Sequence, residues 1–422
     1  MSHPARSVRR IRLSRFPSPR VAALPFILIP VLGLSGCQFP TVAVTPPPPQ
    51  APVVPPPAPP LPPPPPVAVG PHEHLVDTTG RVDIALLVPL SGQMAPIGRD
   101  MLDAAQLAII ELGDDKIALT PKDTKGTAAG AAEAARRAIA EGAKLLVGPL
   151  TASEVEAVQP LAQAAGVNVL AFSNVTRVAG GNVFILGFLP QQEAKRIADY
   201  AHSNGLNHLA VLAPSSDYGQ LTADSFKAAG EADGAEVAPV EFYTPTASDL
   251  KPVVKHLAAN GKYGFNGLLL AEPDPARLKT VAASLPAAEI DPTKVRLLGT
   301  SRWDTPTVGE EPALVGGWYA APPPEARAAF DQHFTEGFGH GPQRLATLAY
   351  DAVGIAAVLE RTPGADFSAH ALENPSGFAG ADGIFRLLAD GTAERGLAVL
   401  QVEHGGVTVV SPAPQSFEAT GQ

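Results

Sequence analysis

Short apolar runs alternate with longer segments of helical spacing along most of this 422-residue chain. Residues 81–89 form an apolar run suited to a buried strand, and residues 97–112 then place apolar side chains at helical spacing, with alanine at packing positions. The same unit recurs, with strands expected at 117–121, 144–147, 168–172, 208–213, 236–243, 267–271 and 295–299. Helices are expected at 127–141, 153–165, 191–203, 220–232, 250–260 and 276–285. This alternation predicts an α/β fold with parallel sheets covered by helices on both faces.

The carboxyl ends of the predicted strands indicate where a ligand is expected. Ligands of open parallel sheets bind in crevices outside these ends. The informative residues should therefore lie in the loops that follow Val88, Val147, Phe172, Ala213, Ala271 and Gly299. About 340 residues follow the N-terminal region, which is enough chain for two cores and predicts two lobes.

The first 37 residues have the pattern of an export signal. Six arginines and no acidic residue occur in the first 20 positions, and an apolar run at 21–34 follows them. This run is shorter than the about 20 residues that cross a bilayer, and two prolines interrupt it, which disfavours a transmembrane anchor. The run ends in Leu-Ser-Gly-Cys at 34–37, which resembles the lipobox of bacterial lipoproteins. The resemblance implies removal of residues 1–36 and lipid modification of Cys37.

The residues after Cys37 bear on the address of the protein. In lipoproteins that the segment resembles, an aspartate just after the cysteine retains the protein in the inner membrane. Here Gln38 and Phe39 follow the cysteine, so we expect sorting to the outer membrane. Within the predicted anchor and tether at 37–80, proline occupies 16 of the 27 positions from 40 to 66. Such a segment should adopt extended polyproline II, in which about 30 residues reach on the order of 100 Å. It is either a spacer or, alternatively, a ligand for an aromatic groove.

Composition narrows the range of partners and chemistries. Removal of residues 1–36 takes away six of the 31 Lys and Arg residues and none of the 41 Asp and Glu residues, which leaves a net charge of −16. An acidic chain without a basic cluster repels phosphate backbones, so no nucleic-acid partner is expected. Because Cys37 is the only cysteine, the domain has no internal disulfide, no cysteine nucleophile and no zinc site with cysteine ligands.

Several loops resemble those of the leucine-binding-protein family of type I periplasmic binding proteins. The matching segments are 89–92 with 97–98, 147–153, 165–174, 217–219, 298–301, 380–385 and 390–391. The resemblance covers roughly residues 81–410 and implies a type I periplasmic-binding fold, with two Rossmann-like lobes joined by three crossovers. It places the domain at 81–411 and a flexible tail at 412–422. Lobe one is expected near 81–187 and 302–362, and lobe two near 188–301 and 363–411.

The resemblance also implies a ligand cleft between the lobes. In amino-acid-binding relatives the ligand carboxylate meets hydroxyls and backbone N–H groups of lobe one, because neutral donors at helix N-termini hold an anion. Thr151, Ser153, Ser173 and Asn174 occupy comparable loops, and Tyr218 resembles the ring that closes over the ligand from lobe two. Each has a structural alternative: the first two as helix caps, the next two as turn residues, and Tyr218 as a packing residue. The remaining cleft candidates are Ser91, Glu272, Ser301 and Trp303.

One loop departs from the pattern of amino-acid binders. Such proteins commonly place an acid after the strand that corresponds to 295–299, where it balances the ligand ammonium, since a buried unpaired cation is costly. Here the loop reads Thr-Ser-Arg-Trp at 300–303, with Asp304 nearby and Glu272 in another loop. Arg302 would repel an ammonium, so the loop disfavours branched-chain amino acids as ligands.

No motif of the chain indicates catalysis. A nucleophile elbow, a His-Glu-x-x-His zinc site and a phosphate-binding loop are all absent from the sequence, so we expect no enzyme, no cofactor and no metal. His72-Glu73-His74 lies at the end of the tether, where a solvated linker is the preferred interpretation over a metal site.

Two functions remain, and the predicted anchor distinguishes them. The chain looks like a shorter relative of the outer-membrane lipoproteins that activate penicillin-binding proteins, which implies a regulatory contact with a bifunctional peptidoglycan synthase across the periplasm. The alternative is the substrate-binding component of an ABC importer, which would dock on an inner-membrane permease and carry a branched-chain amino acid, an amide or another small polar ligand. Fold alone does not choose between them, because function depends on sites grafted on folds.

Overall fold

The first sheet of the domain is a five-stranded parallel sheet. The computed structural model describes residues 80–113, 115–260 and 264–417. The strand order is β2-β1-β3-β4-β5. The strands are β1 (Val82–Val88), β2 (Ile117–Asp123), β3 (Leu145–Val147), β4 (Asn168–Ala171) and β5 (Val183–Ile185). The predicted signal segment, Cys37 and nearly all of the tether lie outside the described residues.

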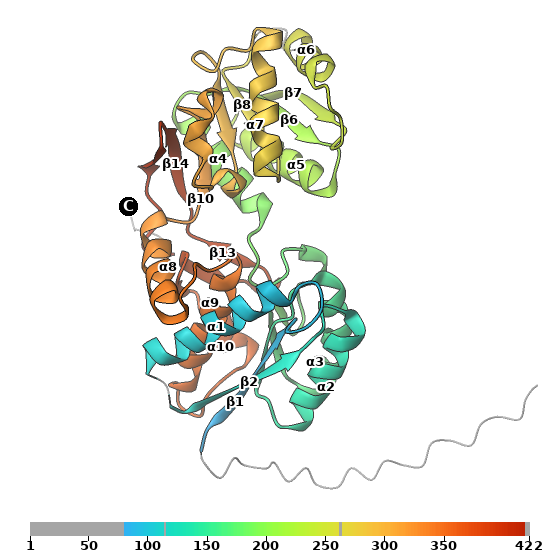
Figure 1. Cartoon of the computed structure of the whole chain (residues 1–422), viewed down its shortest axis with the longest axis vertical. Helices are drawn as coiled ribbons and strands as arrows, with labels where there is room; N and C mark the ends of the chain where they lie inside the picture. Colours follow the sequence, from blue (N-terminus) through green and yellow to red (C-terminus); the bar gives the residue numbers. More distant parts are fainter. Residues whose placement is uncertain (1–79, 114, 261–263, 418–422) are drawn as a thin grey trace, which may run out of the picture. The chain divides into compact units, whose positions relative to one another are not determined.

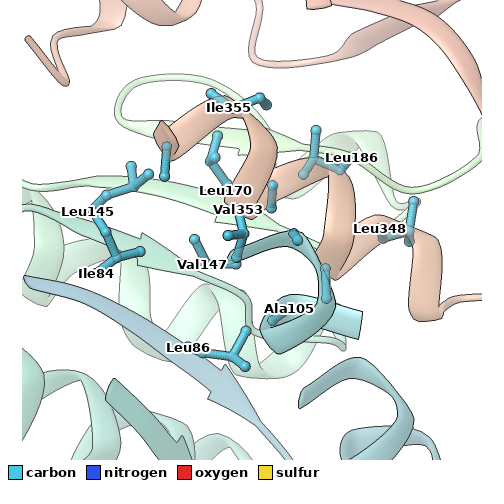
Figure 2. Packing of buried hydrophobic residues seen from close by; sticks show 14 of the residues in the cluster. Ile84, Leu86, Ala105, Leu145, Val147, Leu170, Leu186, Leu348, Val353 and Ile355 are labelled. Atoms are coloured by element: carbon cyan, nitrogen blue, oxygen red, sulfur yellow. The ribbon is translucent and has the colours of Figure 1, made fainter. Parts of the chain in front are cut away.

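Helices cover both faces of this sheet because the side chains of each strand alternate between two apolar surfaces (Figure 1). Ile84 and Leu86 of β1 pack against Met101 on α1 and Leu348 on α9, and Figure 2 shows this core from close by. Leu87 and its neighbours face the opposite way, toward α2 and α3. These helices are α1 (Ala95–Leu112), α2 (Ala128–Ala140), α3 (Ala152–Ala165) and α9 (Ala346–Glu360).

The second sheet has seven strands in the order β15-β14-β10-β9-β8-β6-β7. Its strands are β6 (His208–Pro214), β7 (Glu236–Tyr243), β8 (Gly267–Leu270), β9 (Arg296–Gly299), β10 (Trp318–Ala321), β14 (Ala398–Glu403) and β15 (Gly406–Ser411). Two buried clusters cover its faces, one formed with α4 and α5 and the other with α6 and α7. These helices are α4 (Pro190–Ser203), α5 (Asp217–Ala232), α6 (Lys251–Asn260) and α7 (Pro275–Ser284).

A third, small sheet and two further helices complete the described part. The antiparallel sheet β11-β12-β13 comprises β11 (Phe378–Gly380), β12 (Gly383–Leu387) and β13 (Ala393–Arg395), and the helices are α8 (Pro324–Phe338) and α10 (Ala369–Leu372). Single 3-10 turns occur at η1 (Thr176–Val178), η2 (Leu285–Ala288), η3 (Ser301–Trp303), η4 (Val308–Glu310) and η5 (Pro312–Leu314). Within the described residues, no helix has the length and apolarity needed to span a membrane.

The alternating strands and helices predicted up to residue 299 are confirmed, with ends that differ by a few residues. The predicted parallel sheets are confirmed, and the end of the chain adds strands that the alternation did not predict. Strand β14 pairs antiparallel with β10 and with β15, which adds an antiparallel edge to the second sheet. A hairpin needs no helical crossover, so the strand-helix alternation carries no signal for it.

The predicted lobe boundaries in the second half of the chain are wrong. Trp303 and Tyr319 are buried in the core of the second sheet, so residues 302–321 belong to lobe two. Phe378 and Phe385 are buried against α1 and α9, so residues 324–395 belong to lobe one. The chain therefore passes between the lobes within three described segments, 186–189, 322–323 and 396–397. Apolar spacing indicates that a residue is buried and does not tell which sheet buries it, which explains the error.

The predicted flexible tail is also wrong for residues 412–417. Ala413 is buried in the lobe-two core. The guanidinium carbon of Arg386 lies 4.8 Å from the ring centroid of Phe417, which lies beside Gly377. These contacts attach the end of the described chain to the domain, although its sequence has no helical or strand periodicity.

A close backbone approach positions the loop that follows β1. A Cβ atom on Gly98 of α1 would lie 1.9 Å from the carbonyl oxygen of Pro89. Only glycine therefore allows the first turn of α1 to contact this loop. Met94 and Ile97, which lie between Pro89 and Gly98 in the chain, line the cavity described next.

Candidate ligand-binding cleft

A cavity of about 790 Å³ is lined by residues of both lobes. Lobe one supplies the loops after β1, β3 and β4 and the segment before α9, and lobe two supplies the first turns of α4 and α5 with the loops after β8 and β9. These are mostly the strand ends where the sequence predicted ligand contacts. Cavities of this volume are typical of small-molecule sites.

Thr151 begins helix α3 and lines the cavity. Its Oγ1 donates to Oε2 of Glu154 over 2.8 Å and accepts the backbone N–H of Glu154 over 3.4 Å. The Glu154 carboxylate also accepts the backbone N–H of Thr151 over 2.9 Å, which completes a capping box. The cap interpretation of Thr151 is therefore confirmed, and its position on the cavity leaves a ligand contact as a prediction.

Ser173 and Asn174 follow β4 and also line the cavity. The Ser173 hydroxyl oxygen accepts the backbone N–H of Val175 over 3.2 Å, as a serine in a turn does. Within the described residues, the Asn174 amide makes no hydrogen bond in the protein, so its donors and acceptor are available to a ligand.

Ser301 and Glu193 form a paired contact on the lobe-two wall. Ser301 donates its hydroxyl to one carboxylate oxygen of Glu193 over 2.6 Å and its backbone N–H to the other over 3.1 Å. Burial raises the pKa of the Glu193 carboxyl, while the Ser301 hydrogen bonds and nearby Arg302 oppose the rise. An acid therefore does lie beside the loop after β9, but it comes from the first turn of α4.

Tyr218 lies at the start of α5 with its ring on the cavity. Its hydroxyl is 2.8 Å from Oγ1 of Thr300, and the guanidinium carbon of Arg302 lies 5.7 Å from the ring centroid. Burial raises the pKa of Tyr218 to about 12, so the hydroxyl stays neutral at physiological pH. The ring is thus fixed on the cavity wall by both a hydrogen bond and a cation contact.

Three further charged residues line the cavity: Arg302, Arg344 and Asp304. Burial raises the pKa of Asp304, which accepts the hydroxyl of Tyr319 over 3.2 Å. Arg344 donates to both oxygens of Asp382, at 2.9 and 3.2 Å. Within the described residues, the Arg302 guanidinium makes no ion pair or hydrogen bond.

Phe188, in the first crossover, lies near two arginines at the junction of the lobes. The guanidinium carbons of Arg344 and Arg395 lie 4.2 and 4.8 Å from its ring centroid. Arg395 is buried, contacts Asp351 at 3.4 Å and donates to the carbonyl of Leu186 over 2.8 Å. This network fixes one crossover segment to the core of lobe one.

The sequence profile of periplasmic binding proteins matches residues 81–407. The chain belongs to the periplasmic binding protein family. Its lobes, sheets and crossovers confirm the predicted type I fold. Among solved structures, the fold is similar to that of a Rhodospirillum rubrum protein described as a branched-chain amino acid ABC transporter, with a TM-score of 0.71 and 20% identity over 78% of this chain and 100% of the other.

Curated relatives of this periplasmic binding protein include members of two functional groups. One is the penicillin-binding protein activator LpoA of Glaesserella parasuis, 30% identical over 155 residues, which are 34% of this chain and 24% of the relative. The other is the Leu/Ile/Val-binding protein BraC3 of Rhizobium johnstonii, 26% identical over 216 residues, which are 45% of this chain and 57% of the relative. The aligned region spans between 24% and 61% of the length of the curated relatives.

Five of the cleft candidates in this periplasmic binding protein lie on the cavity, namely Thr151, Ser173, Asn174, Tyr218 and Ser301. The other four do not line it. The hydroxyl of Ser91 donates to Asp123 over 2.6 Å, which ties the loop after β1 to the end of β2. Ser153 is exposed beside Thr151, with their hydroxyl oxygens 3.3 Å apart.

Glu272 and Trp303 are placed in the interior of lobe two. Glu272 accepts the hydroxyl of Tyr243 and the backbone N–H of Asp274, the latter over 2.9 Å, so its carboxylate supports the start of α7. Trp303 is fully buried, with its ring centroid 6.2 Å from that of Tyr319. Their assignment to the cleft is therefore corrected: one supports a helix start and the other fills the core.

The sequence search missed Glu193, Phe188 and Arg344 as residues of the cavity of this periplasmic binding protein. An acid in the first turn of the helix that follows the first crossover is the one signal that points to Glu193. Arg344 and Phe188 reach the cavity only through the packing of α9 and the crossover. Among the described residues there is no cluster of three or more metal-ligating side chains, and His72-Glu73-His74 lies outside them.

Proposed function

We propose that this protein is a non-catalytic regulator of peptidoglycan synthesis, a penicillin-binding protein activator that contacts a bifunctional synthase. The observation that carries the proposal is the state of the two cavity carboxylates. Glu193 is hydrogen-bonded to Ser301 and Asp304 to Tyr319, and burial raises the pKa of both, so neither is a ready counter-charge for an amino-acid ammonium. This favours a role other than amino-acid capture.

Similarity to known activators supports the same role. Over a segment of 155 residues, the chain is 30% identical to the activator of Glaesserella parasuis. Activators and importer components share the family fold, so the similarity supports both functions. The cavity carboxylates favour the activator, because they are poor partners for an amino-acid ammonium.

We further propose that the protein is anchored on the periplasmic face of the outer membrane through Cys37. The support is in the sequence: a lipobox-like segment ends at Cys37, Gln38 rather than aspartate follows it, and a proline-rich segment comes before the domain. Tens of residues of polyproline would let the domain reach a synthase embedded in the inner membrane. Fractionation of cells that express the wild type and Cys37→Ala tests this, and an inner-membrane location of the wild type would contradict it.

The decisive experiment combines the mature lipoprotein with the purified bifunctional synthase of the same organism. We expect binding at micromolar concentration and a faster rate of peptide crosslinking on lipid II. A catalytically inactive synthase serves as the control for binding without turnover. Absence of binding at tens of micromolar, or binding without any change in crosslinking, would overturn the activator proposal.

A second candidate function is the substrate-binding component of an ABC importer, and the 790 Å³ cavity with its free Asn174 amide favours it. This function predicts that a small ligand raises the melting temperature of the purified protein. A screen of amino acids and amides measures the effect, and permease and ATPase genes beside this one would agree with it. A screen without any shift would count against this candidate and leave the activator proposal intact.

A further inference from the structure

We propose that the cavity binds a small carboxylic acid with an apolar body and without an ammonium group, and that Arg302 is its counter-charge. The inference rests on the second candidate function only as far as the cavity takes a small ligand. It names the class of ligand, and it applies equally to a nutrient and to an effector of a regulator.

Arg302 supplies a positive charge on the cavity wall. Arg302 lines the cavity and is exposed, and its guanidinium makes no ion pair within the described residues. The other cavity arginine, Arg344, is already paired with Asp382. Arg302 therefore offers a cation whose N–H donors make no hydrogen bond within the described residues, and guanidinium groups bind carboxylates through paired N–H donors.

The acids on the cavity wall are poorly suited to receive an ammonium. The cavity contains two acids, Glu193 and Asp304, and both already accept hydrogen bonds from the protein. Burial raises the pKa of each, which weakens them as anions. An ammonium placed between them and Arg302 would lose its hydration and meet a cation, so the site disfavours it.

The rest of the cavity wall suits an apolar ligand body. Apolar side chains make up much of the lobe-one surface of the cavity: Met94, Ile97, Leu150, Phe172, Phe188 and Leu345. The polar exceptions in lobe one include Ser173 and the Asn174 amide, which makes no hydrogen bond to the described part of the chain. A wall of this composition buries an aliphatic or aromatic body and orients it with few hydrogen bonds.

The test uses matched pairs that differ only in the ammonium group. Leucine is compared with 4-methylpentanoate and phenylalanine with 3-phenylpropionate, each titrated into the mature protein by calorimetry. We expect each deaminated acid to bind at least about 10-fold more tightly than its amino acid, because both offer the same carboxylate to Arg302 and only the amino acid buries an ammonium without a counter-charge. Tighter binding of the amino acids would overturn the inference while the ligand-binding function stands.

Variants then assign the effect to Arg302. Arg302→Gln should weaken binding of 4-methylpentanoate by about 10-fold or more, and Arg302→Lys should restore part of it. Arg136→Gln is the matched control, since it removes the same charge from the exposed face of α2 and should leave affinity unchanged. Equal affinity of the Arg302→Gln and wild-type proteins would overturn the assignment.

Failure of the ligand inference can be distinguished from failure of the activator proposal. If none of the four probes binds at millimolar concentration, both the inference and the importer candidate fail for apolar ligands. The activator proposal is measured separately, with the synthase, and does not depend on this outcome.

Discussion

Ser301 and Glu193 lie 108 residues apart in the chain, and two hydrogen bonds of 2.6 and 3.1 Å join them on the wall of the cavity. The contact connects the turn after β9 to the first turn of α4, both in lobe two. It explains how a loop without an acid of its own acquires a carboxylate neighbour. It also explains why that carboxylate is already engaged.

Stability should depend on pH through Glu193. Because burial raises its pKa above the ordinary value of 4.5, the folded protein keeps this proton at pH values where the unfolded chain has released it. The contribution of Glu193 to stability is therefore fully present below pH 4.5 and is lost as the pH rises through the raised pKa. The substitution Glu193→Gln should remove this part of the pH dependence.

Urea unfolding of both proteins from pH 4 upward measures the effect. The difference in free energy of unfolding between wild type and Glu193→Gln should shift in favour of the variant as the pH rises. Subtracting the two curves cancels the titration of the other acids, Asp304 among them. A difference that stays constant over the whole range would contradict the assignment to Glu193.

The approach of Gly98 to Pro89 should tolerate no side chain. Gly98→Ala places a methyl group 1.9 Å from a backbone oxygen, so α1 or the loop must move. We expect a loss of about 1–3 kcal/mol in the free energy of unfolding, measured by urea denaturation. The matched control is Gly337→Ala in α8, where a Cβ meets nothing within 4 Å, and it should stabilise by about 0.5–1 kcal/mol. Equal effects of the two substitutions would show that the close contact does not exist.

Comparing Thr151 with Thr127 tests whether a helix-capping threonine also contacts a ligand in the cavity. Both accept a backbone N–H at the start of a helix, α3 and α2 respectively, but only Thr151 lines the cavity. Each alanine substitution should lower the free energy of unfolding by about 1 kcal/mol. Only Thr151→Ala should also weaken the binding of 4-methylpentanoate in calorimetry, because only this hydroxyl reaches the cavity. Unchanged affinity would leave Thr151 with its capping role alone.

Replacing only one partner of the buried pair Arg395–Asp351 should lower the free energy of unfolding strongly. The Arg395 side chain is 3% exposed and that of Asp351 is 0% exposed. Arg395→Met leaves the Asp351 carboxylate buried without its partner, and we expect a loss of about 3–5 kcal/mol in thermal or urea unfolding. The double variant with Asp351→Asn should recover part of this loss, because the orphaned charge is removed.

An exposed pair provides the comparison for this network. Lys195 and Asp199 lie one turn apart on α4, with side chains 67% and 36% exposed. Lys195→Met should change the free energy of unfolding by less than about 1 kcal/mol. If Arg395→Met changed the free energy of unfolding by as little as Lys195→Met, the ion pair in the core of lobe one would not stabilise the fold.

Much of the fold and part of the site follow from local pattern. The apolar run at 81–89 and the helical spacing at 97–112 correspond to β1 and α1, because burial on two sheet faces and on one helix stripe leaves periods that are read directly. The polar residues after β3 and β4, including Thr151 and Ser173, were likewise located from strand ends.

Only the tertiary structure decided which loop side chains lie on the cavity and which lie in the core. Trp303 stands in a polar loop beside cavity residues, yet it fills the core under β9, where glycines at 299 and 317 leave space for its ring. Glu193 has no local mark of a cavity residue and reaches Ser301 only because α4 packs against β9. Local periodicity determines which residues are buried, whereas the partner of each is set by three crossovers that bring distant segments together. The sequence by itself therefore determined the α/β elements and the strand ends, and the tertiary structure decided the lobes, the cavity wall and its charges.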